Sequence, residues 1–322
     1  MLNSYWEYAG TRYKHKFKAI EASHGDIHNI TFNMYESDAF HNYDWSIEPA
    51  HSFKSLMLTR ALQLRDDYSY LKFCYSGGAD STSILNVFLA NNIFIDEIIV
   101  WRFGNNLSNY EVDEYTIPFL KSIQSKIPKT KITIYNYGEE YYREYLNDKW
   151  FYTRNSLCPR HTYLPKINGK NFCYIFGGID PHLEFENGQF YATFYDTNTV
   201  GELAPFRNIE LFYTSPSLPE LHAKQVHIMK KNLKPGFTLE DQKVTLRKLL
   251  RDAPVAPTPN FLSKNWGNIV SMHFQKKSTF VHKEMGSFFS DQFRYLLNTK
   301  INGRAVYRSM LGYSAHKFAL GS

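Results

Sequence analysis

Short apolar runs alternate with segments of helical periodicity through the middle of the chain. The first run, LKFCY, is followed by an apolar helical stripe that includes Ile84 and Phe88. Strands are predicted at 71–75, 97–103, 131–137 and 171–176, and further helices at 109–126 and 139–148. Strands separated by helices favour a parallel sheet covered on both faces. The pattern therefore predicts an α/β protein with a doubly wound parallel sheet.

The N-terminal part of the chain has a different pattern. FKAIEA, from Phe17, and ITFNMYE, from Ile30, resemble two strands, with a turn at Ser23–Asp26 between them. Residues 48–67 then carry a broad apolar stripe that is typical of a helix. We therefore expect a small β-rich element plus a helix over residues 1–67.

The segment after the fourth strand predicts a hairpin and then helices. LEFENGQFYATFY, from Leu183, has Asn187-Gly188 at its centre, a pair that favours a type I′ turn. From about residue 215 the pattern is mostly helical, and the last sixty residues are polar and aromatic. The expected organisation is an α/β domain over 68–235 and a helical or irregular extension over 236–322.

Composition and charge limit the partners. The 322 residues carry a formal charge of +6, a mild excess that suits an anionic ligand or a nucleic acid without requiring either. The three cysteines, Cys74, Cys158 and Cys173, are too few and too widely spaced for a disulfide framework. The first residues do not resemble a signal peptide, and no apolar run reaches the length of a membrane span. We expect a cytoplasmic protein without a membrane partner, and the Tyr, Phe, Asn, Lys and Ile usage suggests an AT-rich coding sequence such as a phage carries.

The hexapeptide SGGADS, residues 76–81, follows the first predicted strand and opens the first helix. Ligands of open parallel sheets bind at the carboxyl ends of the strands, and helix N-termini favour anions. Gly77 and Gly78 allow the backbone to curl so that several N–H groups face one point, and they remove β-carbons that would block a phosphate. A tight turn with an N-cap is the structural alternative, but the whole hexapeptide in this position favours phosphate binding.

The polar residues of the hexapeptide extend this interpretation. Ser76 and Ser81 can add hydroxyl donors to a phosphate site. Asp80 would repel a phosphate unless a divalent cation lies between them, and Mg²⁺ held by a carboxylate and phosphate oxygens satisfies that condition.

The sequence SGGADS resembles the PP-loop, SGGxDS, of the ATP pyrophosphatase superfamily, over all of its fixed positions. The chain contains no Walker A motif. The resemblance implies a Rossmann-like fold of the HUP type, with ATP and Mg²⁺ as cofactors. It also implies cleavage of ATP between its α and β phosphates, with adenylation of a substrate oxygen, release of pyrophosphate and displacement of AMP by a nucleophile.

A second loop, Gly177-Gly178-Ile179-Asp180, follows the fourth strand. In asparagine synthetase-like members of the superfamily a GxGxDE loop in this place supplies an Asp that joins the PP-loop Asp on Mg²⁺. Asp180 and Gly178 match that loop, and Gly177 and Gly178 join the predicted ATP-binding set. Gly177 stands where the family has an acidic residue, and Pro181 stands where it has Glu. The structural alternative for Asp180 is a turn residue, and His182 or Glu184 could replace the missing acidic groups.

Further candidates come from the resemblance or from charge. Lys224, Lys230 and Lys231 are candidates to contact the leaving pyrophosphate, against the alternative of a solvated helix face. Arg154 and Arg160 could bind a substrate carboxylate or phosphate, although surface arginines are common. Trp101, at the end of the second strand, stands where this fold holds adenine.

The resemblance is strongest to the synthetase domain of asparagine synthetases. Residue 2 is Leu, not the Cys of a glutaminase, and the N-terminal region is too short for a glutaminase domain. Any ammonia would therefore be free or delivered by another protein, and an amine could also serve. No CxxC motif supports a thiolase or a zinc-bearing relative. The leading hypothesis is a ligase acting on a small molecule; the alternatives are an ATP-binding module without catalysis and a modifier of nucleic-acid bases.

Overall fold

The architecture is taken from a computed structural model of the chain. It describes residues 5–14, 16–24, 26, 29–33, 39–103, 112–137, 171–177, 181–195, 208–252 and 315–321. None of the described helices is long and apolar enough to cross a membrane.

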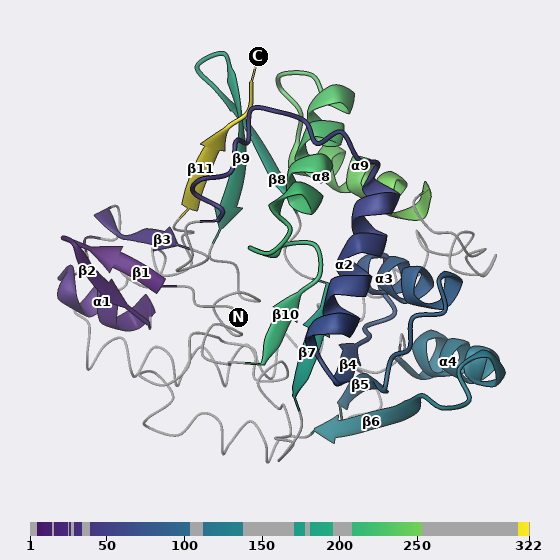
Figure 1. The fold of residues 1–322 in the computed structure, drawn as a ribbon. Coiled ribbons are helices and arrows are strands. Elements are labelled where there is room, and N and C mark those ends of the chain that lie inside the picture. Colours follow the sequence, from purple (N-terminus) through teal and green to yellow (C-terminus); the bar gives the residue numbers. More distant parts are fainter. Residues whose placement is uncertain are drawn as a thin grey trace.

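A five-stranded parallel sheet forms the centre of the fold (Figure 1). Its strands are β4 (Tyr70–Cys74), β5 (Glu97–Phe103), β6 (Lys131–Tyr137), β7 (Phe172–Phe176) and β10 (Ile209–Leu211). The spatial order β10-β7-β4-β5-β6 corresponds to chain order 5-4-1-2-3, the strand order of Rossmann-like folds read from the opposite edge. The predicted α/β class and the four predicted strands are confirmed, whereas β10 has no counterpart among the predicted strands.

One face of the sheet is covered by α2 (Phe53–Asp67), α3 (Ala79–Ala90) and α4 (Ile117–Ile123). Their apolar side chains share one core with the strand residues that face them, such as Phe73 and Ile98. The predicted helix 109–126 is a composite in its described part: the π-helix η3 (Val112–Thr116), then α4, then the short 3₁₀ helix η4 (Gln124–Lys126). The helix predicted at 139–148 lies outside the described residues.

The other face of the sheet belongs to a second apolar cluster. Cys74, Ile99 and Phe176 contribute to it from the strands, and α8 (Pro219–Asn232) contributes Ala223 and Val226. The cluster also includes β8 (His182–Glu186) and β9 (Gln189–Tyr195), which form the predicted hairpin. Asn187 and Gly188 both have positive φ, at 51° and 79°, as a type I′ turn requires.

The described C-terminal region contains a helix and a strand. The helix is α9 (Leu239–Asp252), whereas residues 253–314 lie outside the described part of the chain. β11 (Ala315–Ala319) pairs antiparallel with β9, so that the sheet order is β11-β9-β8. A strand thus replaces the helical or irregular chain expected at 315–319, because its partner strand lies more than a hundred residues earlier and cannot be read from local pattern.

A small antiparallel sheet of order β2-β1-β3 forms most of the N-terminal element. Its strands are β1 (Tyr5–Tyr8), β2 (Thr11–Tyr13) and β3 (Thr31–Asn33), with α1 (Lys16–Ala22) between the last two. The strand predicted at FKAIEA is wrong, because this segment lies in α1. Ala19, Ile20 and Ser23 are buried together, a spacing that fits a helix and not an alternating strand.

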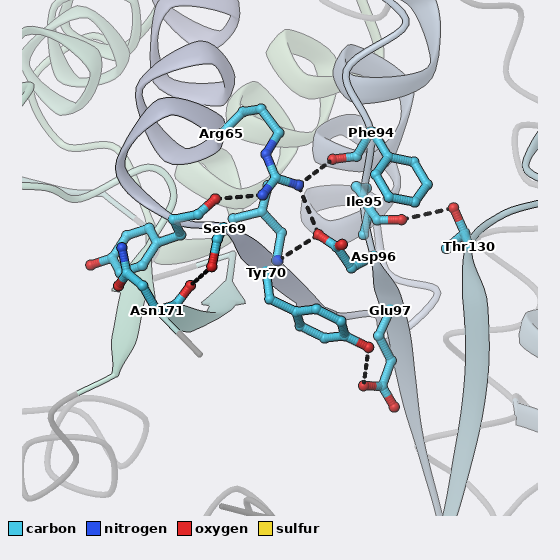
Figure 2. Close-up of polar contacts among 11 residues, drawn as sticks. Arg65, Ser69, Tyr70, Phe94, Ile95, Asp96, Glu97, Thr130 and Asn171 are labelled. Atoms are coloured by element: carbon cyan, nitrogen blue, oxygen red, sulfur yellow. Dashed lines mark hydrogen bonds and ion pairs between the residues drawn. The ribbon is translucent and has the colours of Figure 1, made fainter. Parts of the chain in front are cut away.

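Charged and polar side chains tie the amino ends of the strands together (Figure 2). The Arg65 guanidinium, near the end of α2, donates to Asp96 at 2.7 Å and to the Phe94 carbonyl at 3.2 Å. Asp96 also accepts from the Leu71 backbone N–H at 2.8 Å. Thr130 donates to the Ile95 carbonyl at 2.8 Å, which links β5 to the start of β6. The network fixes where the parallel strands begin.

A buried ion pair lies next to this network. The Lys72 ammonium is 3.2 Å from Glu97, and both side chains are less than 5% exposed. Burial opposes ionisation of Glu97, but the Thr133 hydroxyl at 2.5 Å and the Lys72 charge outweigh it, so the pKa of Glu97 is lowered. Lys131 approaches the same carboxylate at 3.5 Å from a side chain that is 66% exposed. One carboxylate therefore has a buried and an exposed cationic partner.

The two lysines provide a matched test of this ion pair. We expect Lys72→Met to lower the free energy of unfolding by about 3–5 kcal/mol, because it leaves a buried carboxylate without its buried cation. Lys131→Met removes an exposed partner and should cost about 0–1 kcal/mol. Urea denaturation of the two variants measures both values. Equal losses would contradict the assignment of the buried pair.

Candidate functional site

The 76–81 loop comprises the turn after β4 and the first three residues of α3. The hydroxyls of Ser76 and Ser81 lie 3.0 Å apart, and the Gly78 backbone N–H donates to the Ser76 hydroxyl at 3.2 Å. Ser81 also donates to the Gly78 carbonyl at 3.2 Å. Ser81 is buried, Ser76 is exposed, and Asp80 is half-buried. The loop is thus held from within and is open to solvent on one side.

The start of α3 has the properties of an anion site. Gly78 is its N-cap, with extended backbone angles and no side-chain cap hydrogen bond. The N–H groups of the first turn of a helix have no intrahelical partner, and the helix dipole favours negative charge there. A bound anion can accept from such a first turn.

Position 77 requires glycine for two reasons, its backbone conformation and the lack of room for a β-carbon. Its φ is +78°, in the left-handed region that favours glycine, and a β-carbon there would collide with the Thr116 hydroxyl. Thr116 also donates to the Ser76 carbonyl at 3.5 Å. Thr116 ends the π-helix η3, a rare conformation that occurs frequently at functional sites. The side chain of Thr116 therefore packs directly on the loop.

The π-helix is fixed to the sheet by a bidentate ion pair. Arg102, near the end of β5, places two guanidinium nitrogens 2.8 Å and 3.0 Å from the two carboxylate oxygens of Asp113. This geometry is more directional than a single contact. It connects the carboxyl end of β5 to the segment that carries Thr116.

The second predicted loop begins beside the first. β7 neighbours β4 in the sheet, and Gly177 follows β7 directly. A β-carbon on Gly177 would lie 3.4 Å from the Asp80 β-carbon, so the two loops are neighbours at this point and leave no room for a large side chain without adjustment. The contact lies at the topological switch point, because the chain adds β5 on one side of β4 and later β7 on the other. Gly178 and Asp180 lie outside the described residues.

The other predicted site residues lie at several places. Trp101 is on β5, and its ring stacks on Phe176 with centroids 5.9 Å apart, close to where Gly177 begins the second loop. The Lys224 ammonium contacts Glu48 at 2.7 Å and the Pro49 carbonyl at 2.9 Å. Lys230 donates to the Gly321 carbonyl. Both lysines lie on α8. Lys224 thus contacts the N-terminal segment and Lys230 contacts the C-terminal segment, and neither of these contacts involves the 76–81 loop. Arg154 and Arg160 lie outside the described part of the chain.

Two residues at the site were not among the predictions. Thr116 contacts the loop from a helix whose π geometry is not visible in the sequence, and Tyr213 contacts Asp80 from the end of the unpredicted strand β10. The one signal that could have indicated Tyr213 is its position, two residues after a short apolar run, where a strand of the parallel sheet would end.

The described residues fit Mg²⁺–ATP in part. The glycine cradle at Gly77 and Gly78, the serine hydroxyls and the open start of α3 suit phosphate oxygens. Asp80 is a suitable oxygen ligand for Mg²⁺. Among the described residues, which do not include Asp180, no group of three or more His, Cys, Asp or Glu side chains could hold a metal.

Comparisons with protein-family models, with curated proteins and with solved structures find no match to this chain. The functional assignment therefore depends on the 76–81 loop and its place in the sheet.

Substitution of Gly77 tests whether the loop requires this backbone. Gly77→Ala should destabilise the fold by more than about 1 kcal/mol, because the left-handed conformation and the collision with Thr116 both oppose a β-carbon. Gly236→Ala is the matched control, since Gly236 also has positive φ, at 92°, but open space around its α-carbon. Chemical denaturation of both variants measures the difference. A loss at Gly77 no larger than at Gly236 would contradict the contact with Thr116.

The pH dependence of stability tests the structural role of Lys224. Hydrogen bonds from Lys224 and Lys231 lower the pKa of Glu48 from 4.5 to about 2. The pair therefore stabilises the fold fully above about pH 4.5 and loses this contribution as the pH falls through about 2. We expect Lys224→Met to cost about 1 kcal/mol at pH 7 and progressively less in acid.

Lys230→Met is the control for this pH dependence. The Lys230 ammonium contacts a backbone carbonyl, which does not titrate. The stability lost in Lys230→Met should therefore not follow the titration of Glu48. Denaturation curves between about pH 3 and pH 7 compare the two variants. A pH-independent cost of Lys224→Met would show that Lys224 does not stabilise ionised Glu48.

Proposed function

We propose that this protein is an ATP-dependent ligase with a PP-loop of the HUP type. It adenylates a carboxylate or carbonyl oxygen of a small molecule, releases pyrophosphate, and passes the activated group to ammonia or an amine. In this respect it resembles the synthetase domain of asparagine synthetases.

One observation carries the proposal. The SGGADS loop occupies the carboxyl end of the central strand of a five-stranded parallel sheet and lies beside Gly177, the first residue of the second glycine loop, at the switch point. In open α/β sheets this is the place where ligands bind. Residue identity and position in the fold thus support the same kind of site.

Each described loop residue has a chemical role in this proposal. The N–H groups of the first turn of α3, with the hydroxyls of Ser76 and Ser81, hold phosphate oxygens and orient the α-phosphorus. Asp80 and Asp180 would hold Mg²⁺, which when bound neutralises charge on the phosphates. The substrate oxygen attacks the α-phosphorus, and the bond to the β-phosphate breaks. The amine nitrogen then bonds to the activated carbon, AMP leaves, and the nitrogen gives up a proton to a base.

An ATP-binding module is the second candidate, and Gly177 favours it. The resemblance places an acidic residue at this position, and the chain has no side chain there. Such a module would retain the phosphate cradle and lose the second step of the reaction.

Product analysis separates these candidates. The purified protein is incubated with ATP, Mg²⁺ and pools of candidate carboxylates and amines, and the phosphorus products are followed by ³¹P NMR. We expect AMP and pyrophosphate, with turnover reduced at least about a hundredfold by Asp80→Asn because a ligand for Mg²⁺ is lost.

Glu114→Gln is the control: it removes an exposed carboxylate of η3 that is assigned neither to Mg²⁺ nor to the ion pair with Arg102, and it should retain most of the activity. ATP binding without turnover in any pool would favour the binding module. ADP and phosphate as products would contradict cleavage between the α and β phosphates.

A further inference from the structure

We infer that Tyr213 is a positioning residue that couples the two loops of the proposed nucleotide site. The inference rests on the proposed function, because it concerns how Asp80 and the loop after β7 are held in register for Mg²⁺–ATP. Tyr213 follows β10 and lies one residue beyond Phe212.

The backbone of Tyr213 holds the second loop. Phe212 donates to the Phe176 carbonyl at 2.8 Å, and Tyr213 donates to the Gly177 carbonyl at 3.1 Å. The pairing of β10 with β7 therefore continues beyond β7 and includes the first residue of the loop. Gly177 is therefore held by the segment that follows β10, at the point where it lies beside Asp80.

The side chain of Tyr213 holds the first loop. Its hydroxyl donates to the Asp80 carbonyl at 3.1 Å, within the first turn of α3. One residue thus bonds to Gly177 through its N–H and to Asp80 through its hydroxyl. The spacing between the two loops is set by the rigid length of a tyrosine side chain.

The ring of Tyr213 is itself fixed. It is 3% exposed and stacks against Phe53, the first residue of α2, with centroids 6.3 Å apart and planes 15° apart. Phe212 packs edge-on against it at 5.3 Å. A ring held on two sides cannot follow a shift of the loop, so its hydroxyl acts as a fixed reference for Asp80. Because positioning groups must themselves be locked by packing, this arrangement fits such a role.

The test measures nucleotide affinity in Tyr213→Phe. This change removes the bond to Asp80 and preserves the ring. We expect the Kd of α,β-methylene-ATP, an analogue that cannot be cleaved between these phosphates, to rise about fivefold to tenfold in the presence of Mg²⁺. The increase should be smaller in EDTA, because misplacement of Asp80 weakens the metal-dependent part of binding. Isothermal titration calorimetry measures both values.

Tyr68→Phe is the matched control. Tyr68 donates to Glu210, also on the β10 segment, at 2.6 Å, but at the amino end of the sheet. This variant removes a phenol hydroxyl bonded to a charged group, so it should lose at least as much stability as Tyr213→Phe and leave the Kd unchanged. A merely structural role for Tyr213 predicts that the two variants behave alike in the titration.

The outcomes separate the inference from the proposed function. The inference is supported if the wild type and Tyr68→Phe bind the analogue equally well and Tyr213→Phe binds it more weakly. If the Kd of Tyr213→Phe equals that of the wild type, the inference is overturned while the proposed function stands. Failure of the wild type to bind the analogue overturns both. If Tyr213→Phe does not fold, Phe53→Leu keeps the hydroxyl and loosens the ring, and an unchanged Kd in that variant overturns the inference.

Discussion

The pairing of β4 on both of its edges is the constraint on which the rest of the structure depends. β4 bonds to β5 on one side and to β7 on the other, so both edges of its backbone are hydrogen-bonded to neighbouring strands. Side chains on both of its faces lie in apolar clusters. The chain leaves β4 toward one edge of the sheet and returns at β7 to extend the other edge. The loops after these two strands therefore begin side by side at the carboxyl ends of β4 and β7, at the switch point where open parallel sheets bind ligands.

The two ends of the strands have different tasks. At the amino end, charged pairs such as Arg65 with Asp96 and Lys72 with Glu97 fix the starts of the strands. At the carboxyl end, the contacts that hold the 76–81 loop join hydroxyls to hydroxyls, backbone N–H groups and carbonyls. The internal contacts of the loop thus use uncharged groups, and Asp80 is the one acidic or basic side chain among residues 76–81. Ion pairs at the amino ends of the strands thus support a polar site at their carboxyl ends.

Strands β4, β5 and β7 could be predicted from sequence because they are mostly buried and read as nearly continuous apolar runs. The edge strand β6 is partly exposed and was visible as an alternating pattern instead. β10 has only three residues and α1 only seven, too few for a periodic pattern to separate helix from strand. β11 was not predictable locally, because its partner β9 is remote in the chain. The glycine loop was visible as a motif, whereas Thr116 and Tyr213 reach it only through the tertiary fold. Local pattern thus indicates where the site is, and packing decides what supports it.

The missing side chain at Gly177 has a physical consequence for catalysis. A carboxylate there would stand beside Asp80, and two carboxylates at this spacing raise each other's pKa unless a cation lies between them. Glycine avoids that repulsion but leaves the second step of the proposed reaction without an acid–base group at this position. Of the two substitutes near the loop, Glu184 is already committed, since its carboxylate pairs with Lys317 at 2.6 Å. His182 begins β8 directly after the loop, and imidazole is a common general base, so His182 is the other candidate for the base that receives the amine proton in the proposed reaction.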